Sequence, residues 1–225
     1  MAIDATPIPT KKLSQRAYEL IKNDIIGCLL EPGGLLDEIS ISKRYGIGRT
    51  PFREACHRLE PEGLVKVVPH RGVFVANFSS EDINDLFELR TALEPAVAEL
   101  ACVRHRGDDL AVLVRNLDEC SRLNQVKRSM IVVESTLNSK EFHVQVARLA
   151  RNREMIRLID SIHDKLSRIF IHTARRSPDH APFNCIHPEI LDAIRRRDRE
   201  KAREAMMNDI DEARKWIRDF GMPQS

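Results

Sequence analysis

Apolar runs in this 225-residue sequence are too short to cross a membrane. The longest, such as Ile-Ile-Gly-Cys-Leu-Leu at 25–30, fall well below the roughly 18 residues that a membrane-spanning helix requires. The first ten residues also lack the basic flank and apolar core of a secretory signal, so we expect a polar arm over residues 1–10. These absences predict no transmembrane segment, no membrane partner and a cytoplasmic protein.

Paired cysteines and catalytic motifs are also missing. The five cysteines are widely spaced and no two form a C-x-x-C pair, which excludes a disulfide framework and a thiolate zinc knuckle. The sequence has no Gly-rich phosphate loop and no G-x-S-x-G nucleophile motif, so an enzyme is not expected. With 36 Lys and Arg against 34 Asp and Glu, the formal charge is only +2, which excludes a strongly basic nucleic-acid coat protein.

The pattern of the chain changes near residue 78. Nearly all strand and turn signals precede this point, whereas one amphipathic helix follows another from Ser79 onward. The length exceeds that of one typical domain of about 100–150 residues. We therefore expect two domains, at 11–78 and 79–225, and a fold that is mainly α.

The first domain has the element order of a winged helix-turn-helix. Ile39 and Ile41 are expected to face inward on its second helix, and Gly46-Ile47-Gly48 forms a tight turn before the third. Pro51 suits the first turn of that third helix, where its missing N–H has no partner to lose. The expected elements are helices at 11–30 and 37–45, a helix from about residue 50, and a hairpin with strands near 63–68 and 73–76.

In such a unit the third helix enters the major groove of DNA. Arg49, Thr50 and Arg53 lie at its start, where donors to bases and phosphates are needed. Arg58 either clamps a phosphate or is solvated. Seven basic and three acidic residues between positions 43 and 71 give a local charge of +4, which favours phosphate binding. The alternative is a small helical domain with a solvated basic face.

These residues resemble the GntR family of bacterial transcription regulators. The resemblance implies that the wing tip, His70, Arg71 and Gly72, enters the minor groove. Gly48 departs from the family's usual serine or threonine, so a hydroxyl contact to phosphate is missing. Glu54 is expected to orient an arginine or to cap the helix. The matching stretches are Leu36-Asp37-Glu38, Tyr45-Gly46-Ile47, Gly48 to Ala55, Arg58-Leu59-Glu60, Glu62 to Val65 and Pro69 to Gly72.

The second domain is expected to be an all-α bundle. Ser79-Ser80-Glu81-Asp82 has the form of a capping box that starts its first helix. Arg90 interrupts the apolar face of that helix, so it must be paired or must serve a ligand. Glu94, one turn later, is the candidate partner. Further helices are expected at about 108–125, 129–150, 153–175, 184–196 and 198–219.

This domain resembles the FCD domain, the ligand-sensing module of the FadR subfamily. The matching stretches are Glu88 to Pro95, Glu141-Phe142-His143 and His187 to Ile194, followed by Asp198 and Ala202. The resemblance implies a divalent metal, Zn, Ni or Mn, held here by His143, His187 and Asp209. The family's usual Asp is replaced by Ser139, so a metal-free sensor with an acyl-type pocket stays open. If the match to the family's pattern is shifted by one residue, Asn138 and Asn208 take the places of Ser139 and Asp209.

Together these patterns predict a homodimeric, ligand-responsive repressor on a palindromic operator of double-stranded DNA. FCD relatives sense small carboxylates or sugar acids, and Arg90 would supply positive charge to such an effector. Ser139 and His163 are the other effector candidates, although His163 also fits a core position. The competing hypothesis is a metal-dependent enzyme in which His143, His187 and Asp209 activate water.

Overall fold

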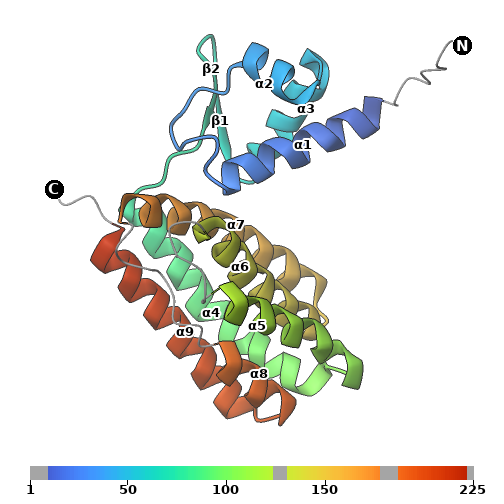
Figure 1. Cartoon of the computed structure of the whole chain (residues 1–225), viewed down its shortest axis with the longest axis vertical. Helices are drawn as coiled ribbons and strands as arrows, with labels where there is room; N and C mark the ends of the chain where they lie inside the picture. Colours follow the sequence, from blue (N-terminus) through green and yellow to red (C-terminus); the bar gives the residue numbers. More distant parts are fainter. Residues whose placement is uncertain (1–9, 124–130, 178–186, 222–225) are drawn as a thin grey trace, which may run out of the picture. The chain divides into compact units, whose positions relative to one another are not determined.

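The computed structural model describes residues 10–123, 131–177 and 187–221, shown as coloured ribbon in Figure 1. The chain divides into two compact units between Phe78 and Ser79. Over residues 10–78 the first contains three helices and a two-stranded sheet, and the second is helical throughout its described part. The expected fold class, a winged helix-turn-helix followed by a helical bundle, is confirmed.

The first unit follows the predicted element order. Its α1 ends four residues earlier than expected, because Gly27 leaves the helix and Cys28 adopts a left-handed φ of 51°. The elements are α1 (Thr10–Ile26), α2 (Glu38–Tyr45), α3 (Arg49–Leu59), β1 (Val65–Val68) and β2 (Gly72–Val75).

The α2–α3 joint is built from local hydrogen bonds. The Asp37 side chain accepts a hydrogen bond from the Ser40 N–H at 2.8 Å and caps α2, as expected for an N-cap aspartate. Gly46 ends α2 with a left-handed φ of 64°. The expectation for Ile39 is wrong: Ile41 is buried, but Ile39 is 72% exposed. Two residues apart on a helix point to opposite sides, so only one of them can face the core.

One core holds this unit together. Helices α1 and α3 pack against each other, and the antiparallel strands pair from Val65 with Val75 to Val68 with Gly72. An isolated bridge between Leu35 and Phe74 ties the segment before α2 to the sheet. The buried residues are Ala17, Ile21, Ile25, Leu36, Ile41, Ile47, Phe52, Ala55, Cys56, Leu59, Leu64, Val65 and Val75.

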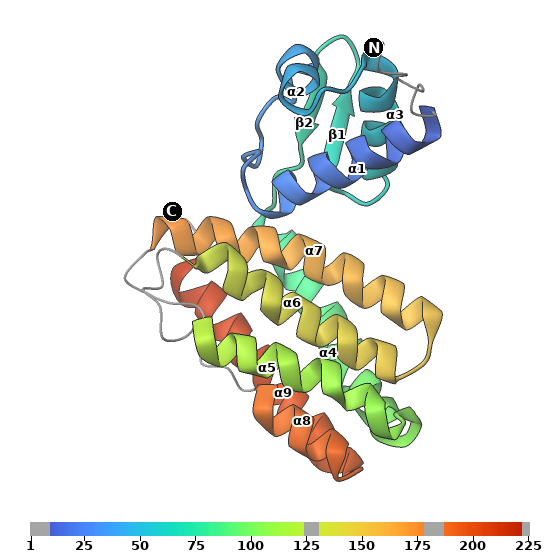
Figure 2. The same ribbon diagram turned by 45° about the vertical axis from the view of Figure 1, so that its right-hand side comes forward.

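The second unit places its first helix at the centre. Ser79 and Asp82 form the predicted capping box at the start of α4, and α4 packs against α6, α7, α8 and α9 (Figures 1 and 2). The elements are α4 (Ser80–Arg104), a 3-10 turn (Gly107–Leu110), α5 (Ala111–Leu123), α6 (Val132–Leu149), α7 (Arg153–Arg176), α8 (His187–Arg195) and α9 (Arg199–Phe220). The ends of three predicted helices, at 124–125, 129–130 and 184–186, lie outside the described residues.

Two sequence-based exclusions can be compared with the described part of the chain. None of its helices is long and apolar enough to span a membrane. Cys28, Cys56, Cys102 and Cys120 form no disulfide within the described residues, and Cys185 lies outside them.

Candidate functional site

The start of α3 presents its basic side chains to solvent. The side chains of Arg49 and Arg53 are 80% and 67% exposed, and Thr50 is also exposed. The opposite face of the helix, including Phe52 and Ala55, is buried in the core. The helix is therefore anchored by one face, and the three predicted contact residues are accessible to a duplex.

Glu38 contacts both arginines, and the sequence did not single it out. Its Oε1 lies 3.3 Å from Nε of Arg49, and its Oε2 lies 3.3 Å from Nε of Arg53. Glu54, which was expected to orient an arginine or cap the helix, does neither: it accepts a hydrogen bond from Ser14 Oγ on α1. Glu54 follows Arg53 in sequence, but α1 packs on the side of α3 to which Glu54 points.

Arg58 is directed toward α1. Its Nη1 donates to Gln15 Oε1 at 2.9 Å, and its Cζ lies 3.9 Å from the centre of the Tyr18 ring. This cation–π contact is of the kind that fixes an arginine at a protein surface. The structure thus gives Arg58 an intramolecular role, and its phosphate contact stays a prediction.

The wing tip joins β1 to β2. His70, Arg71 and Gly72 are all exposed there, and the Arg71 N–H donates to the Val68 carbonyl at 3.0 Å. Gly72 has a φ of 111°, and a Cβ at this position would lie 3.0 Å from Leu35 Cδ1. The φ favours glycine, whereas the exposed Leu35 side chain can move away from an added Cβ, so it is the backbone conformation of the wing tip that depends on this residue.

The helical unit contains a buried group of charged and ionisable residues, which we call the inner cluster: Arg90, Glu94, His143, His163, His187 and Asp209. Arg90 is 2% exposed. Its Nε lies 2.6 Å from Glu94 Oε1, which confirms the pairing predicted one turn apart, and its Nη2 lies 3.1 Å from Asp209 Oδ2. Burial opposes the charge on Arg90, but the two carboxylates outweigh that effect and raise its pKa. Arg90 is therefore a paired cation within the bundle.

Three histidines from three helices converge on the same carboxylates. His143 lies between them, with Nδ1 2.7 Å from Glu94 Oε2 and Nε2 3.3 Å from Asp209 Oδ2. His163 Nε2 is 3.0 Å from Glu94 Oε1, and His187 Nε2 is 3.5 Å from Asp209 Oδ1. Ring stacking holds two of these imidazoles in place: His163 lies on His143, with ring centres 4.4 Å apart, and His187 lies on Phe142 at 4.2 Å.

The pKa values of the three histidines are shifted in different directions. Burial opposes the charged form of His143, but Glu94 and Asp209 outweigh it and raise its pKa to about 9. Burial dominates at the other two, and lowers the pKa of His163 to about 4 and that of His187 to about 3. Burial also opposes ionisation of the two acids, yet Arg90 and the histidines hold the pKa of Glu94 and of Asp209 below their ordinary values.

The donor set fits a divalent metal. His143, His187 and Asp209 place one ligand atom each within 4.8 Å of one another, and all three are buried. The lowered pKa keeps His187 neutral near pH 7, so its Nε2 lone pair is available for an ion. Its buried Nδ1 has no hydrogen-bond partner in the described part of the chain. Two imidazoles and a carboxylate suit Zn, Ni or Mn. Glu94, His143 and His163 form a second group of the same kind.

Ser139 lies beside this donor set but is a weaker ligand. Its Oγ is 3.5 Å from His187 Nε2. Neither substitute residue reaches the cluster: Asn138 exchanges hydrogen bonds with Asn116, and Asn208 lines a different pocket. The structure therefore places Ser139 and Asp209, not their neighbours, at the cluster.

A cavity of about 10 Å³ lies next to the cluster. This volume holds about one water molecule, so a larger ligand requires the surrounding side chains to move. Lys140, which the sequence did not single out, reaches the cavity and pairs with Asp164 and Asp160 on α7. The cavity is lined by Arg90, Thr136, Ser139, Lys140, His143, His163, Ser167, Phe170, Asp209 and Ala213.

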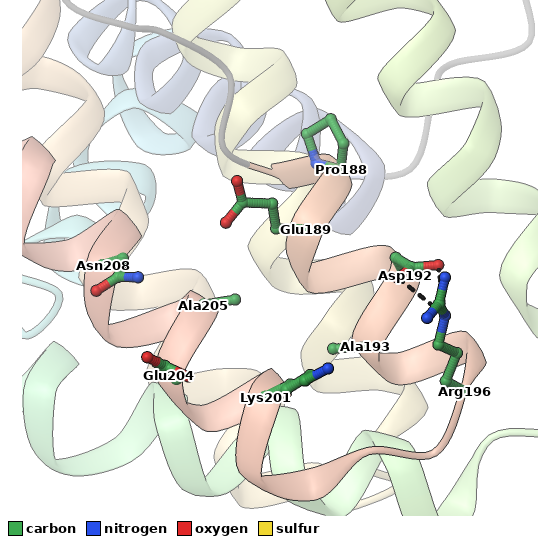
Figure 3. Close-up of a pocket in the computed structure, with 9 residues that line it drawn as sticks. All are labelled: Pro188, Glu189, Asp192, Ala193, Arg196, Lys201, Glu204, Ala205 and Asn208. Atoms are coloured by element: carbon green, nitrogen blue, oxygen red, sulfur yellow. Dashed lines mark hydrogen bonds and ion pairs between the residues drawn. The ribbon is translucent and has the colours of Figure 1, made fainter.

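A larger and more open pocket of about 470 Å³ lies between α8 and α9. Figure 3 shows its lining, with dashed lines for the ion pair between Asp192 and Arg196. Arg196 Nε lies 3.0 Å from Asp192 Oδ2. Three acids and two basic residues line it, and of the predicted ligand residues it contains only the substitute Asn208. An excess of carboxylates disfavours an anionic ligand. Its lining is Pro188, Glu189, Asp192, Ala193, Arg196, Lys201, Glu204, Ala205 and Asn208.

Two family models match the chain. The model of the FCD domain matches residues 85–212, which is more than half of the chain. The model described as bacterial regulatory proteins, gntR family, matches residues 13–75. Each match falls within one of the two structural units.

The chain is also similar to complete regulators. It is 26% identical to the HTH-type transcriptional repressor RspR of Escherichia coli K12, over 100% of this chain and 97% of that protein. It is 24% identical to the uncharacterized HTH-type transcriptional regulator YdhC of Bacillus subtilis 168, over 84% of each. The solved structure of E. coli McbR/YncC has a TM-score of 0.76 at 16% identity, covering 92% of this chain and 97% of that one. At this identity the structural likeness shows the fold alone.

Proposed function

Because this chain belongs to the gntR family of bacterial regulatory proteins and carries an FCD domain, it is a transcriptional regulator, and we propose that it is a ligand-responsive repressor. The exposed arginines at the start of α3 carry this proposal. Arg49, Thr50 and Arg53 bind bases and phosphates in the major groove, Arg58 binds a phosphate, and the wing residues His70, Arg71 and Gly72 enter the minor groove. Such a regulator acts on cytoplasmic DNA.

A homodimer on a palindromic operator is the geometry that we propose for DNA binding. A two-fold protein presents two copies of its recognition helix, which is α3 in this proposal, to the two half-sites of one sequence. Repression is supported by the similarity to RspR, which is named a repressor. The effector favours a dimer geometry whose half-site spacing does not match the operator. It must bind this geometry more tightly than the DNA-binding geometry by a few kcal/mol.

The effector is a small carboxylate or a sugar acid bound at the inner cluster. Arg90 and a divalent metal held by His143, His187 and Asp209 supply the positive charge, and Ser139 and His163 complete the site. A bound ion would supply an electrophilic centre for an effector carboxylate. The hydroxyl and charged groups around the cavity favour this ligand class over the long apolar chain of an acyl-type effector. The family consists of transcriptional regulators, so no catalytic role is assigned.

DNA reading is tested with Arg53→Ala. The wild-type protein is used to select its preferred duplex from a randomised pool, and affinity is then measured at physiological salt. We expect Arg53→Ala to bind this duplex about 10-fold or more weakly, because one bidentate base contact is lost. Its thermal stability should stay near that of wild type, since the side chain is exposed. Unchanged affinity in the variant would remove the recognition-helix assignment.

Metal binding is tested with His143→Ala, after purification without chelator. Elemental analysis should show the metal content of the variant well below that of wild type, and basal affinity for the selected duplex should persist. His172→Ala, which changes a histidine outside both groups of ligands, is the control. A variant that retains the wild-type metal content means that the ligand set is misassigned. A wild-type protein without metal supports the metal-free, acyl-type alternative.

A further inference from the structure

Glu38 forms ion pairs with both exposed arginines at the start of α3, Arg49 and Arg53. It is the first residue of α2, and its side chain is 26% exposed. Each of its carboxylate oxygens contacts a different arginine, Oε1 with Arg49 and Oε2 with Arg53, both at 3.3 Å. In the described part of the chain, Glu38 has no other ion-pair partner. The contact therefore links α2 to the start of α3 through its DNA-facing side chains.

The contact has two physical effects on the arginines. Two guanidinium groups next to a common point repel each other, and a carboxylate between them removes that repulsion. Arginine also has many rotamers, so two unrestrained side chains would lose much conformational freedom when they bind DNA. Glu38 reduces both costs before any duplex is bound, which is preorganisation of the reading groups.

The atoms used in the contact matter for base recognition. Glu38 meets each arginine through Nε, so Nη1 and Nη2 stay available for the O6 and N7 atoms of guanine. A carboxylate near the DNA also repels phosphates, and this penalty applies to every sequence. Correct base contacts compensate for the repulsion only on a matching sequence, which is how a repulsive element creates specificity.

We propose that Glu38 is a positioning residue that makes DNA recognition selective, by fixing Arg49 and Arg53 and by weakening binding to unmatched DNA. This inference rests on the proposed DNA-reading function and adds a determinant of specificity to it. Glu38 itself makes no base contact in this arrangement.

The test compares two variants on two duplexes. One duplex is the sequence selected by the wild-type protein, and the other is a scrambled duplex of the same composition. Glu38→Gln removes the charge, so it should bind the scrambled duplex a few-fold more tightly and discriminate between the duplexes about 10-fold less. Glu38→Asp keeps the charge but is one methylene shorter and cannot reach both arginines. It should lose discrimination without a gain on the scrambled duplex.

Glu19→Gln is the matched control. It removes the same charge from an exposed residue of α1 that contacts Gln15 and no arginine of α3. Its ratio of the two affinities should equal that of wild type. Circular dichroism melting identifies any variant that fails to fold; if Glu38→Gln unfolds, Glu38→Asp decides, because it retains the acidic first turn of α2.

The outcomes separate this inference from the proposed function. If either folded Glu38 variant keeps the wild-type discrimination, Glu38 is not a positioning residue and the inference is wrong. If the ratio also falls in Glu19→Gln, the effect is general electrostatics and the inference is again wrong. If the wild-type protein selects no sequence, the proposed function fails and this inference fails with it.

Discussion

At the scale of single residues, the inner cluster shows how ionised groups remain buried in a helical bundle. Arg90 and a protonated His143 carry two positive charges, and Glu94 and Asp209 carry two negative ones. Each contact in this set is 3.3 Å or shorter. Isolated buried charges cost several kcal/mol, and only compensation of this kind makes them tolerable. A divalent ion would replace the proton on His143, because an imidazole must be neutral to act as a ligand.

The raised pKa of His143 predicts a pH dependence for protein stripped of metal. Its pKa is about 9 in the folded state and about 6.5 when unfolded. The folded state therefore holds the proton more tightly, and this contribution is fully present below pH 6.5 and is lost as the pH rises through about 9. Between pH 7 and 8.5 the free energy of unfolding should fall by on the order of 1 kcal/mol per pH unit.

Urea unfolding followed by the fluorescence of Trp216, the single tryptophan, measures this slope in the second unit. His143→Gln should lack it, and comparison of the two proteins cancels the contribution of the other histidines. Measurements stop at pH 8.5 because the pKa of the buried Cys102 thiol is raised to about 11. Ionisation of that thiol in the unfolded state adds a slope of the same sign at higher pH. Equal slopes in wild type and His143→Gln would contradict the assignment.

At the scale of elements, the start of α3 is incompletely capped. Gly48 occupies the N-cap position of α3 with φ −81° and ψ 174°, and no side chain caps the helix. Pro51, at the third helical position, has no N–H, so the Thr50 N–H is the donor that a capping side chain would satisfy. A Cβ on Gly48 would approach Pro51 Cδ no closer than 3.8 Å. Both the backbone angles and the available space are therefore compatible with serine.

Gly48→Ser should stabilise the first unit by a few tenths of a kcal/mol, because serine is a better N-cap than glycine. The hydroxyl can also donate to a DNA phosphate, and we expect affinity for the selected duplex to rise about 5-fold, equivalent to one hydrogen bond of about 1 kcal/mol. Thermal melting and a DNA titration measure the two effects. Gly48→Ala adds the Cβ without the hydroxyl and should improve neither; an equal gain in Gly48→Ala would exclude the hydroxyl as the cause.

At the scale of the whole molecule, each unit has its own buried core. The first is assembled from α1, α2, α3 and the hairpin. The second contains the charged cluster described above, together with apolar residues that include Phe87, Phe142 and Ile210. No residue of the inner cluster belongs to the first unit.

This separation predicts the behaviour of the fragment 1–78. It should fold alone, as seen by circular dichroism, because its core is complete. It should bind the selected duplex roughly 100-fold more weakly than the full chain, since the proposed homodimer engages two half-sites at once and the fragment engages only one. The full chain in the same titration is the reference. Equal affinities would mean that dimerisation by the second unit contributes nothing to DNA binding.

Several features follow from the residues alone. Asp37, Gly46 and Ser79 lie where helices start or stop, and short-range hydrogen bonding is enough to fix those boundaries. The pairing of Arg90 with Glu94 also depends on one helical turn. By contrast, the expectation for Ile39 is wrong because residues two apart point to opposite sides of a helix, so only one of Ile39 and Ile41 can face the core.

The sequence by itself determined the order of helices, the caps and the placement of Arg49 and Arg53 at the start of α3, because these depend on residues a few positions apart. Only the tertiary structure decided that Asp209 contacts Arg90 across 119 positions, that Glu94 faces two histidines, and that Glu38 and not Glu54 meets the arginines. Such contacts depend on how helices rotate and pack against one another. That packing is set by the whole core at once, and no local pattern in the chain encodes it.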